Sequence, residues 1–174
     1  MNIEFPKAII PDEIPALLDF DRRAFQAYQS DIFPPEEWKK YDSYWMIVDG
    51  EIIGCAALEA LRKDYLWIAS TAILPEYRNH EFGTRLKQWE IDYAKSHGFS
   101  RIGTMMRQSN EAIIRLNEKF GFKSVPTQHR YPTPDEPGLK MELQLPLPVC
   151  PQCGKTLRTH RAKQCRFCKV AWHQ

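Results

Sequence analysis

Four cysteines near the C-terminus have the type and spacing of metal ligands. Cys150 and Cys153 form one Cys-x-x-Cys pair, Cys165 and Cys168 form another, and residues 154–164 separate the pairs. Two such turns can place four thiolates as a tetrahedron around zinc. Disulfides are the alternative, but we expect an intracellular protein, where they are rare, and bridges within single turns would restrain little of the chain. The spacing therefore predicts a structural Zn²⁺ site.

Net charge divides the chain at nearly the same place. The 174 residues hold 24 Lys and Arg against 22 Asp and Glu. All 22 acids and 18 of the bases lie in residues 1–148, a net −4, whereas residues 149–174 hold six bases and no acid. The tail has too few apolar residues to fold alone, so that a metal would supply the missing stability. We predict two domains, residues 1–147 and residues 148–174.

A second group of residues suits a phosphate. An apolar strand predicted at 66–74 leads through a polar loop into a helix predicted at about 83–97. The first N–H groups of a helix are unpaired and lie at the positive end of its dipole, which favours a phosphate or pyrophosphate. Arg78 adds charge, and Gly83 lets the backbone approach a ligand. An ordinary strand–helix connection is the alternative.

These residues need a framework, and the apolar pattern predicts an α/β (α+β) protein. Asp49-Gly50 between two apolar runs predicts a tight hairpin. Helices that return between strands favour a mixed central sheet with helices on both faces. The predicted strands are 3–10, 44–48, 51–58, 65–74, 101–106, 122–125 and 139–145, and the predicted helices are 12–25, a short one at 36–38, 83–97 and 110–120.

The strand, loop and helix together resemble the GNAT superfamily of CoA-dependent N-acetyltransferases. The family signature, Arg/Gln-x-x-Gly-x-Gly/Ala after a Val/Ile-x-Pro turn, is matched by residues 73–75 (Ile-Leu-Pro), Arg78 and Gly83. Glu81 stands where the family has its first glycine. A second family block resembles residues 110–122, which read NEAIIRLNEKFGF. The resemblance covers about residues 3–145 and implies a GNAT-like fold.

The resemblance also implies where acetyl-CoA, the cosubstrate, would bind. Family members hold it in a V-shaped gap between two parallel strands, here 66–74 and 101–106. Backbone N–H groups near Ala72 and Ile73 would bind the pantetheine and polarise the thioester carbonyl. Asn110 would contact the pantetheine arm, and Asn117 lies in the same block. The pyrophosphate would lie against the loop and helix start, formed by Arg78, Asn79, His80, Glu81, Phe82, Gly83 and Thr84.

The candidates for proton transfer are fewer. A neutral amine would attack the thioester directly, so that proximity and removal of the ammonium proton are the main tasks. Glu59, at the end of a predicted strand, could act as the base directly or through water, or be a solvated charge. Asn117 replaces a family tyrosine that often protonates the departing thiolate; asparagine cannot supply that proton. Tyr131, on a proline-rich loop with His129, is the remaining candidate, and Cys55 is expected to be a core residue.

The acceptor side and the tail complete the prediction. Residues 25–38 would form the acceptor wall, with Asp31, Glu36 and Glu37 either facing a cationic amine or peptide N-terminus or forming a solvated helix start. The tail resembles short zinc ribbons with CPxCG turns. It would bind nucleic acid or protein, pack on the first domain, or support a homodimer.

We expect an acetyl-CoA-dependent N-acetyltransferase acting on an amine-bearing small molecule or protein. The alternative is a catalytically weak GNAT-like binding module docked on nucleic acid or protein through its ribbon. No apolar run is long enough for a membrane helix and no secretory signal is evident, so we expect a cytoplasmic protein without membrane contact.

Overall fold

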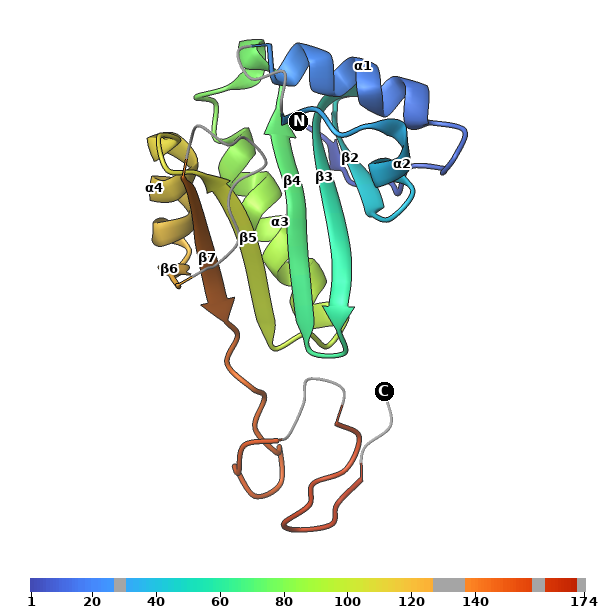
Figure 1. Ribbon diagram of the computed structural model, residues 1–174. Coiled ribbons are helices and arrows are strands. Elements are labelled where there is room, and N and C mark those ends of the chain that lie inside the picture. The colour runs from blue at the N-terminus through green and yellow to red at the C-terminus, as the bar shows by residue number, and fades with distance from the viewer. Residues whose placement is uncertain (27–30, 127–136, 158–161, 172–174) are drawn as a thin grey trace.

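A mixed seven-stranded sheet forms the centre of the protein (Figure 1). The computed structural model describes residues 1–26, 31–126, 137–157 and 162–171. The strands lie in the order β1-β2-β3-β4-β5-β7-β6, and every neighbouring pair is antiparallel except β4 and β5, which are parallel. The strands are β1 (Ile3–Glu4), β2 (Asp42–Val48), β3 (Glu51–Arg62), β4 (Tyr65–Ile73), β5 (Arg101–Arg107), β6 (Lys123–Ser124) and β7 (Gly138–Gln144).

Helices cover both faces of this sheet, as the sequence predicted. Helices α1 (Ile14–Ala24) and α2 (Pro35–Trp38) pack on one face, where Leu17 and Trp38 are fully buried. Helices α3 (Phe82–Ser96) and α4 (Glu111–Lys119) pack on the other, and a short 3-10 helix, η2 (Pro75–Tyr77), joins β4 to α3. Among the described residues, no helix is both long and apolar enough to cross a membrane.

The first predicted strand is shorter than expected. Residues 3–10 were predicted as one strand, but the regular ladder ends after Ile3–Glu4. Pro6 explains the break, because proline has no N–H to donate to a ladder. The chain nevertheless continues beside β2: the Ala8 N–H donates to the Ser43 carbonyl at 2.8 Å, and Lys7 forms an isolated bridge with Tyr44.

The parallel pair β4 and β5 separates halfway along its length. Pairing ends at Ile68 and Thr104, although β4 continues to Ile73 and β5 to Arg107. On the other side of β4 the register with β3 shifts, which leaves Ala69 as an extra residue. Such a bulge bends a strand. Since β5 remains paired with β7 up to Arg107, the two parallel strands enclose a gap that no strand fills.

Gly103 lies near the closed end of this gap, opposite Trp67. The ring of Tyr65 covers it so closely that a Cβ at Gly103 would lie 2.0 Å from the Tyr65 hydroxyl oxygen. That hydroxyl donates to Glu142 at 2.9 Å, and the Arg101 guanidinium lies 4.2 Å from the ring centre. Tyr65 therefore joins β4, β5 and β7 below the gap.

The C-terminal segment forms two similar turns beyond the end of β7 (Figure 1). Isolated bridges Val149–Thr156 and Gln164–Ala171 close them. The residue after each second cysteine, Gly154 and then Lys169, is left-handed. The described residues of the segment have a small core of their own, made by Cys150, Leu157 and Cys165 with Ala162 and Cys168. The domain division at residue 147 stays a prediction.

Asp21 of α1 is a carboxylic acid buried in the apolar core. Its side chain is 1% exposed, and within the described part of the chain neither oxygen has a hydrogen-bond partner. Burial raises the pKa of Asp21 from 3.8 to about 7, which the backbone of Phe33 opposes only in part. The charged form of Asp21 therefore destabilises the folded state at neutral pH.

We expect Gly103→Ala to destabilise the fold by about 1–3 kcal/mol, because the new methyl group must displace the Tyr65 ring from its three-strand contact. Urea unfolding would measure the loss. Gly83→Ala is the matched control, since a Cβ there has its nearest contact at 3.8 Å, from Leu116. Equal stability of the two variants would contradict the packing role of Gly103.

We expect Asp21→Asn to stabilise the protein more in base than in acid. The pKa of Asp21 is raised in the folded protein. Between about pH 4 and about pH 7, Asp21 is therefore ionised in the unfolded chain but protonated in the folded one, and wild type loses stability as the pH rises. The gain of the variant over wild type should grow by about 2–3 kcal/mol between about pH 5 and about pH 8. Urea unfolding at both pH values tests this, with exposed Asp19→Asn as the control; a gain independent of pH would refute it.

Candidate functional site

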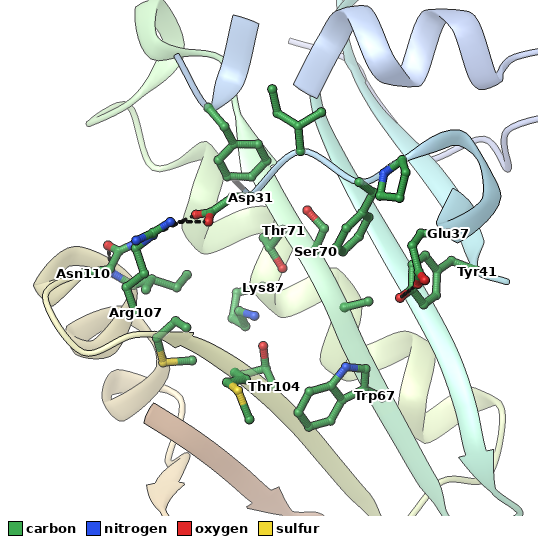
Figure 2. Close-up of a pocket in the computed structure, with 18 residues that line it drawn as sticks. Asp31, Glu37, Tyr41, Trp67, Ser70, Thr71, Lys87, Thr104, Arg107 and Asn110 are labelled. Carbon is green, nitrogen blue, oxygen red and sulfur yellow. Dashed lines mark hydrogen bonds and ion pairs between the residues drawn. The ribbon is translucent and has the colours of Figure 1, made fainter. Parts of the chain in front are cut away.

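A cavity of about 510 Å³ occupies the gap between β4 and β5 (Figure 2). One side is formed by the two strand edges and the start of α4, and the other by residues 31–34 with α2. The sequence predicted both walls. The lining residues are Phe25, Asp31, Ile32, Phe33, Pro34, Glu37, Tyr41, Trp67, Ala69, Ser70, Thr71, Lys87, Thr104, Met105, Met106, Arg107, Asn110 and Ile113.

The separation of the strands leaves part of the β4 backbone without a strand partner. The Leu74 N–H donates to the Ile53 carbonyl of β3 at 3.0 Å. Successive N–H groups of a strand point to opposite edges, so the Ile73 N–H faces the gap and the Ala72 N–H faces β3. Of these two predicted contacts, Ile73 thus offers its N–H to a ligand in the gap.

The loop before α3 has the form of an anion site. Phe82, Gly83 and Thr84 form the first turn of α3, whose N–H groups have no partner within the helix. Asn79 and Glu81 are left-handed, with φ of 66° and 64°. Glycine adopts this conformation without strain, which explains why a glycine suits the position of Glu81. Both side chains are exposed, as is His80.

Arg78 connects this loop to the opposite side of the cavity. Its Nε donates to the Ile73 carbonyl at 3.0 Å, and its Nη2 donates to the Ala24 carbonyl at 2.5 Å. The guanidinium therefore joins the end of β4 to the end of α1. Because arginine has five N–H donors, these two bonds leave others for an anion.

The two asparagines of the second family block lie in different surroundings. Asn110 caps α4 by accepting the Ile113 N–H at 3.3 Å, and it lines the cavity, so that a cap and a ligand contact are compatible. Asn117 is completely buried. Its amide lies 4.0 Å from the Met106 sulfur and 3.9 Å from the Met141 sulfur, and it is not among the described residues that line the cavity.

Neither Glu59 nor Tyr131 is among the described residues that line the cavity. Glu59 is partly exposed and pairs in register with Trp67, which lines the cavity. Tyr41 donates to Glu37 at 3.0 Å. Burial, with smaller effects of Glu37 and Glu59, raises the pKa of Tyr41 well above its ordinary value. Tyr131 and His129 fall outside the described residues, and the prediction for them stays untested.

The acids of the predicted acceptor wall are paired with bases. Asp31 and Arg107 form a two-point ion pair, with N–O distances of 2.6 and 3.1 Å, at one end of the cavity (Figure 2). Glu37 pairs with Lys40 at 2.5 Å, and Glu36 with Lys39 at 2.9 Å. The wall therefore presents aromatic surface with little net charge.

A buried ion pair at the cavity wall was not predicted. Lys87 and Glu90 of α3 are 1% and 0% exposed, and Nζ lies 2.6 Å from Oε2. The Thr71 hydroxyl of β4 donates to the other carboxylate oxygen at 2.5 Å. The i, i+3 spacing was the available signal, because it places both side chains on one side of a helix beside the buried Leu86 and Ile91.

The four C-terminal cysteines gather as predicted. Their sulfur atoms lie within 4.8 Å of one another, with 3.6 Å between Cys150 and Cys168 and between Cys153 and Cys165. A tetrahedral zinc site requires about 3.8 Å between sulfurs for Zn–S bonds of about 2.3 Å, whereas a disulfide requires about 2.05 Å. Backbone N–H groups of Cys168 and Phe167 lower the pKa of Cys165 to about 6, whereas for Cys168 the backbone N–H of Val170 is outweighed by burial and the neighbouring cysteines, which together raise its pKa to about 11. The donor set fits zinc.

Comparisons with known proteins agree with this geometry. The model of the acetyltransferase (GNAT) family matches residues 14–122. The [ribosomal protein bS18]-alanine N-acetyltransferase of Escherichia coli is 24% identical over 139 residues, which cover 79% of this chain and 92% of that protein. The probable N-acetyltransferase camello of Xenopus laevis is 28% identical over 83 residues, which cover 46% of this chain and 38% of camello.

Solved structures show the same fold. The E. coli ribosomal-protein-S18-alanine N-acetyltransferase superposes with a TM-score of 0.66 at 22% identity, covering 83% of this chain and 94% of that one. A GNAT family acetyltransferase from Elizabethkingia anophelis with acetyl-CoA bound gives 0.65 at 18% identity, covering 83% and 99%. The family model spans more than half of the sequence and its residues build the β4–β5 gap, so the chain belongs to the GNAT acetyltransferase family.

Proposed function

We propose that the protein is an acetyl-CoA-dependent N-acetyltransferase that transfers the acetyl group directly to the amine of a protein or small molecule. The observation that carries the proposal is the cavity where β4 and β5 separate. It combines an unpaired strand edge, the α3 N-terminus nearby and an aromatic wall opposite. The names of the relatives, which include an alanine N-acetyltransferase, support an amine acceptor.

Each part of the site has a chemical task in this proposal. Bound acetyl-CoA supplies an activated thioester. The first turn of α3 and Arg78 hold the pyrophosphate, and the Ile73 N–H holds the arm in the gap. Phe33, Tyr41 and Trp67 exclude water and orient the acceptor. Direct attack by a neutral amine then depends chiefly on proximity and on loss of the ammonium proton, for which Glu59, the strand neighbour of Trp67, is the candidate base.

A catalytically weak binding module is the second candidate. Two observations favour it: Glu81 brings a negative charge to the loop, and Asn117 in the tyrosine position cannot donate a proton. Glu81 is exposed, however, so that its carboxylate can remain in solvent when a pyrophosphate binds. Acetyl transfer itself distinguishes the two candidates.

We expect Gly83→Glu to weaken acetyl-CoA binding by at least about tenfold, because a carboxylate would then project beside the pyrophosphate. The fold should be retained, since the site has room for a side chain and an acid stabilises a helix N-terminus. Calorimetric titration measures the affinity. Gly83→Gln, of equal size but neutral, is the matched control and should bind more tightly than Gly83→Glu.

Turnover is tested by mass spectrometry of peptide and amine mixtures incubated with acetyl-CoA. Wild type that binds no acetyl-CoA at sub-millimolar concentration would overturn the enzyme proposal. Binding without any acetylated product, across peptides with varied N-termini and small amines, would favour the binding module.

We also propose that the cysteine cluster holds one structural zinc ion. All four positions would be filled by protein thiolates, so that no open position remains for catalysis. The ribbon would offer a basic surface to nucleic acid or an acidic protein. Lys155 and Arg166 both lie 4.6 Å from the ring centre of exposed Phe167, which places aromatic and positive groups together. Binding that weakens steeply with salt would support a nucleic-acid partner.

Metal analysis should find about one zinc per chain, as four thiolates of a tetrahedral site require. Cys153→Ser with Cys168→Ser should abolish it, because two ligands cannot hold the ion. Cys55→Ala should keep the zinc, since Cys55 is buried in the sheet core and serves as the control. A native, metal-free protein would rule the site out.

A further inference from the structure

Lys87 is a buried ammonium group inside the β4–β5 gap. It comes from α3, on the face of the sheet opposite α1 and α2, and its side chain is 1% exposed. Figure 2 shows it between Thr71 of β4 and Thr104 of β5, and it lines the cavity. Where two strands remain paired, the ladder would separate such a side chain from the other face. The gap instead opens Lys87 to whatever occupies the cavity.

The local hydrogen bonds leave Lys87 with unused donors. One carboxylate oxygen of Glu90 accepts the Thr71 hydroxyl at 2.5 Å, and the other lies 2.6 Å from the Lys87 Nζ as an ion pair, without a hydrogen bond among the described residues. Lys87 has three N–H donors, and within the described part of the chain Glu90 is its only ion-pair partner. The ring of Phe122 lies 5.6 Å from Nζ and covers another side. The Lys87 ammonium therefore has N–H donors that can reach a group bound in the gap.

We infer that the Lys87 ammonium stabilises the thiolate that forms on the sulfur of CoA as the thioester is cleaved. The inference rests on the proposed function, because it needs the thioester in the β4–β5 gap. Asn117 cannot act in this way: its amide faces two methionine sulfurs and carries no positive charge. Glu90 and Thr71 act as positioning residues that fix the Lys87 ammonium in the gap.

The step balances without another reagent. The acceptor nitrogen attacks the acetyl carbon, a C–N bond forms, and the C–S bond breaks with its electron pair on sulfur. The Lys87 ammonium keeps its proton and pairs with that thiolate. The acceptor nitrogen loses one proton as the amide forms, and this proton leaves through the base on the acceptor side. The products are the N-acetylated acceptor, the CoA thiolate paired with Lys87, and the released proton.

The remaining charges around the cavity do not duplicate this role. Arg107 is engaged by Asp31 at the far end, and Glu37 by Lys40 and Tyr41 at the outer wall. Behind the ion pair, burial raises the thiol pKa of Cys55 in β3, and the charges of Asp21 and Glu90 raise it further. On α3 and the elements packed against it, Glu90 is therefore the charge that Lys87 meets directly.

The test compares free CoA with acetyl-CoA, whose sulfur cannot ionise. If Lys87 faces the sulfur, bound CoA should have a thiol pKa about 1–3 pH units below that of free CoA. Calorimetry across about pH 6–10 should then show CoA affinity rising about tenfold or more relative to acetyl-CoA. Ultraviolet absorbance of the thiolate gives the same pKa directly. In Lys87→Met the relative affinity should no longer depend on pH.

Two further variants serve as controls. Lys87→Met alone leaves Glu90 charged and without its ion-pair partner in the core, which can destabilise the fold. The double variant Lys87→Met with Glu90→Met removes the whole ion pair and is expected to fold. Lys95→Met, exposed on the same helix, should behave as wild type. Binding of acetyl-CoA with an identical CoA profile in wild type and the Lys87 variants would overturn the role of Lys87. Absence of acetyl-CoA binding in every protein would instead overturn the proposed function.

Discussion

The early end of one parallel strand pair determines the chemistry of this protein. Hydrogen bonding between β4 and β5 stops at Ile68 and Thr104, while both strands continue, held by β3 and β7 on their outer sides. A strand edge in mid-sheet is thereby left for a ligand in place of a neighbouring strand. The same gap provides the cavity, turns the Ile73 N–H into a donor and gives a side chain of α3 access to the opposite face.

Local residue patterns predicted the order of the elements well. Asp49-Gly50 between apolar runs predicted the hairpin, and both residues have positive φ as a type I′ turn needs. Gly98 and Gly121, which follow helices α3 and α4, are left-handed, as suits a glycine that ends a helix. The exception was the first strand, where apolar residues on both sides of Pro6 suggested a continuous ladder. Proline removes a donor without making the segment less apolar, so that hydrophobic periodicity alone does not detect the break.

The sequence predicted those parts of the site that depend on the backbone of one segment or on the spacing of residues within it. The Cys-x-x-Cys pairs and the loop before α3 are short and contiguous, and the structure has them in the expected form. The Lys87–Glu90–Thr71 contact joins residues from a helix and a strand, and it exists only because α3 crosses under the gap. The i, i+3 spacing of Lys87 and Glu90 indicates a pair on one side of the helix, but only tertiary packing decides that the pair is buried and that it meets the gap.

Arg78 carries a consequence for how an anion would enter. Its guanidinium already holds two carbonyl oxygens, those of Ile73 and Ala24, which act as resident ligands supplied by the chain itself. The remaining N–H donors can bind an anion while both carbonyl bonds persist. Because Ala24 ends the helix that leads into the acceptor wall, one rigid guanidinium would then connect an anion on the cofactor side to the backbone on the acceptor side.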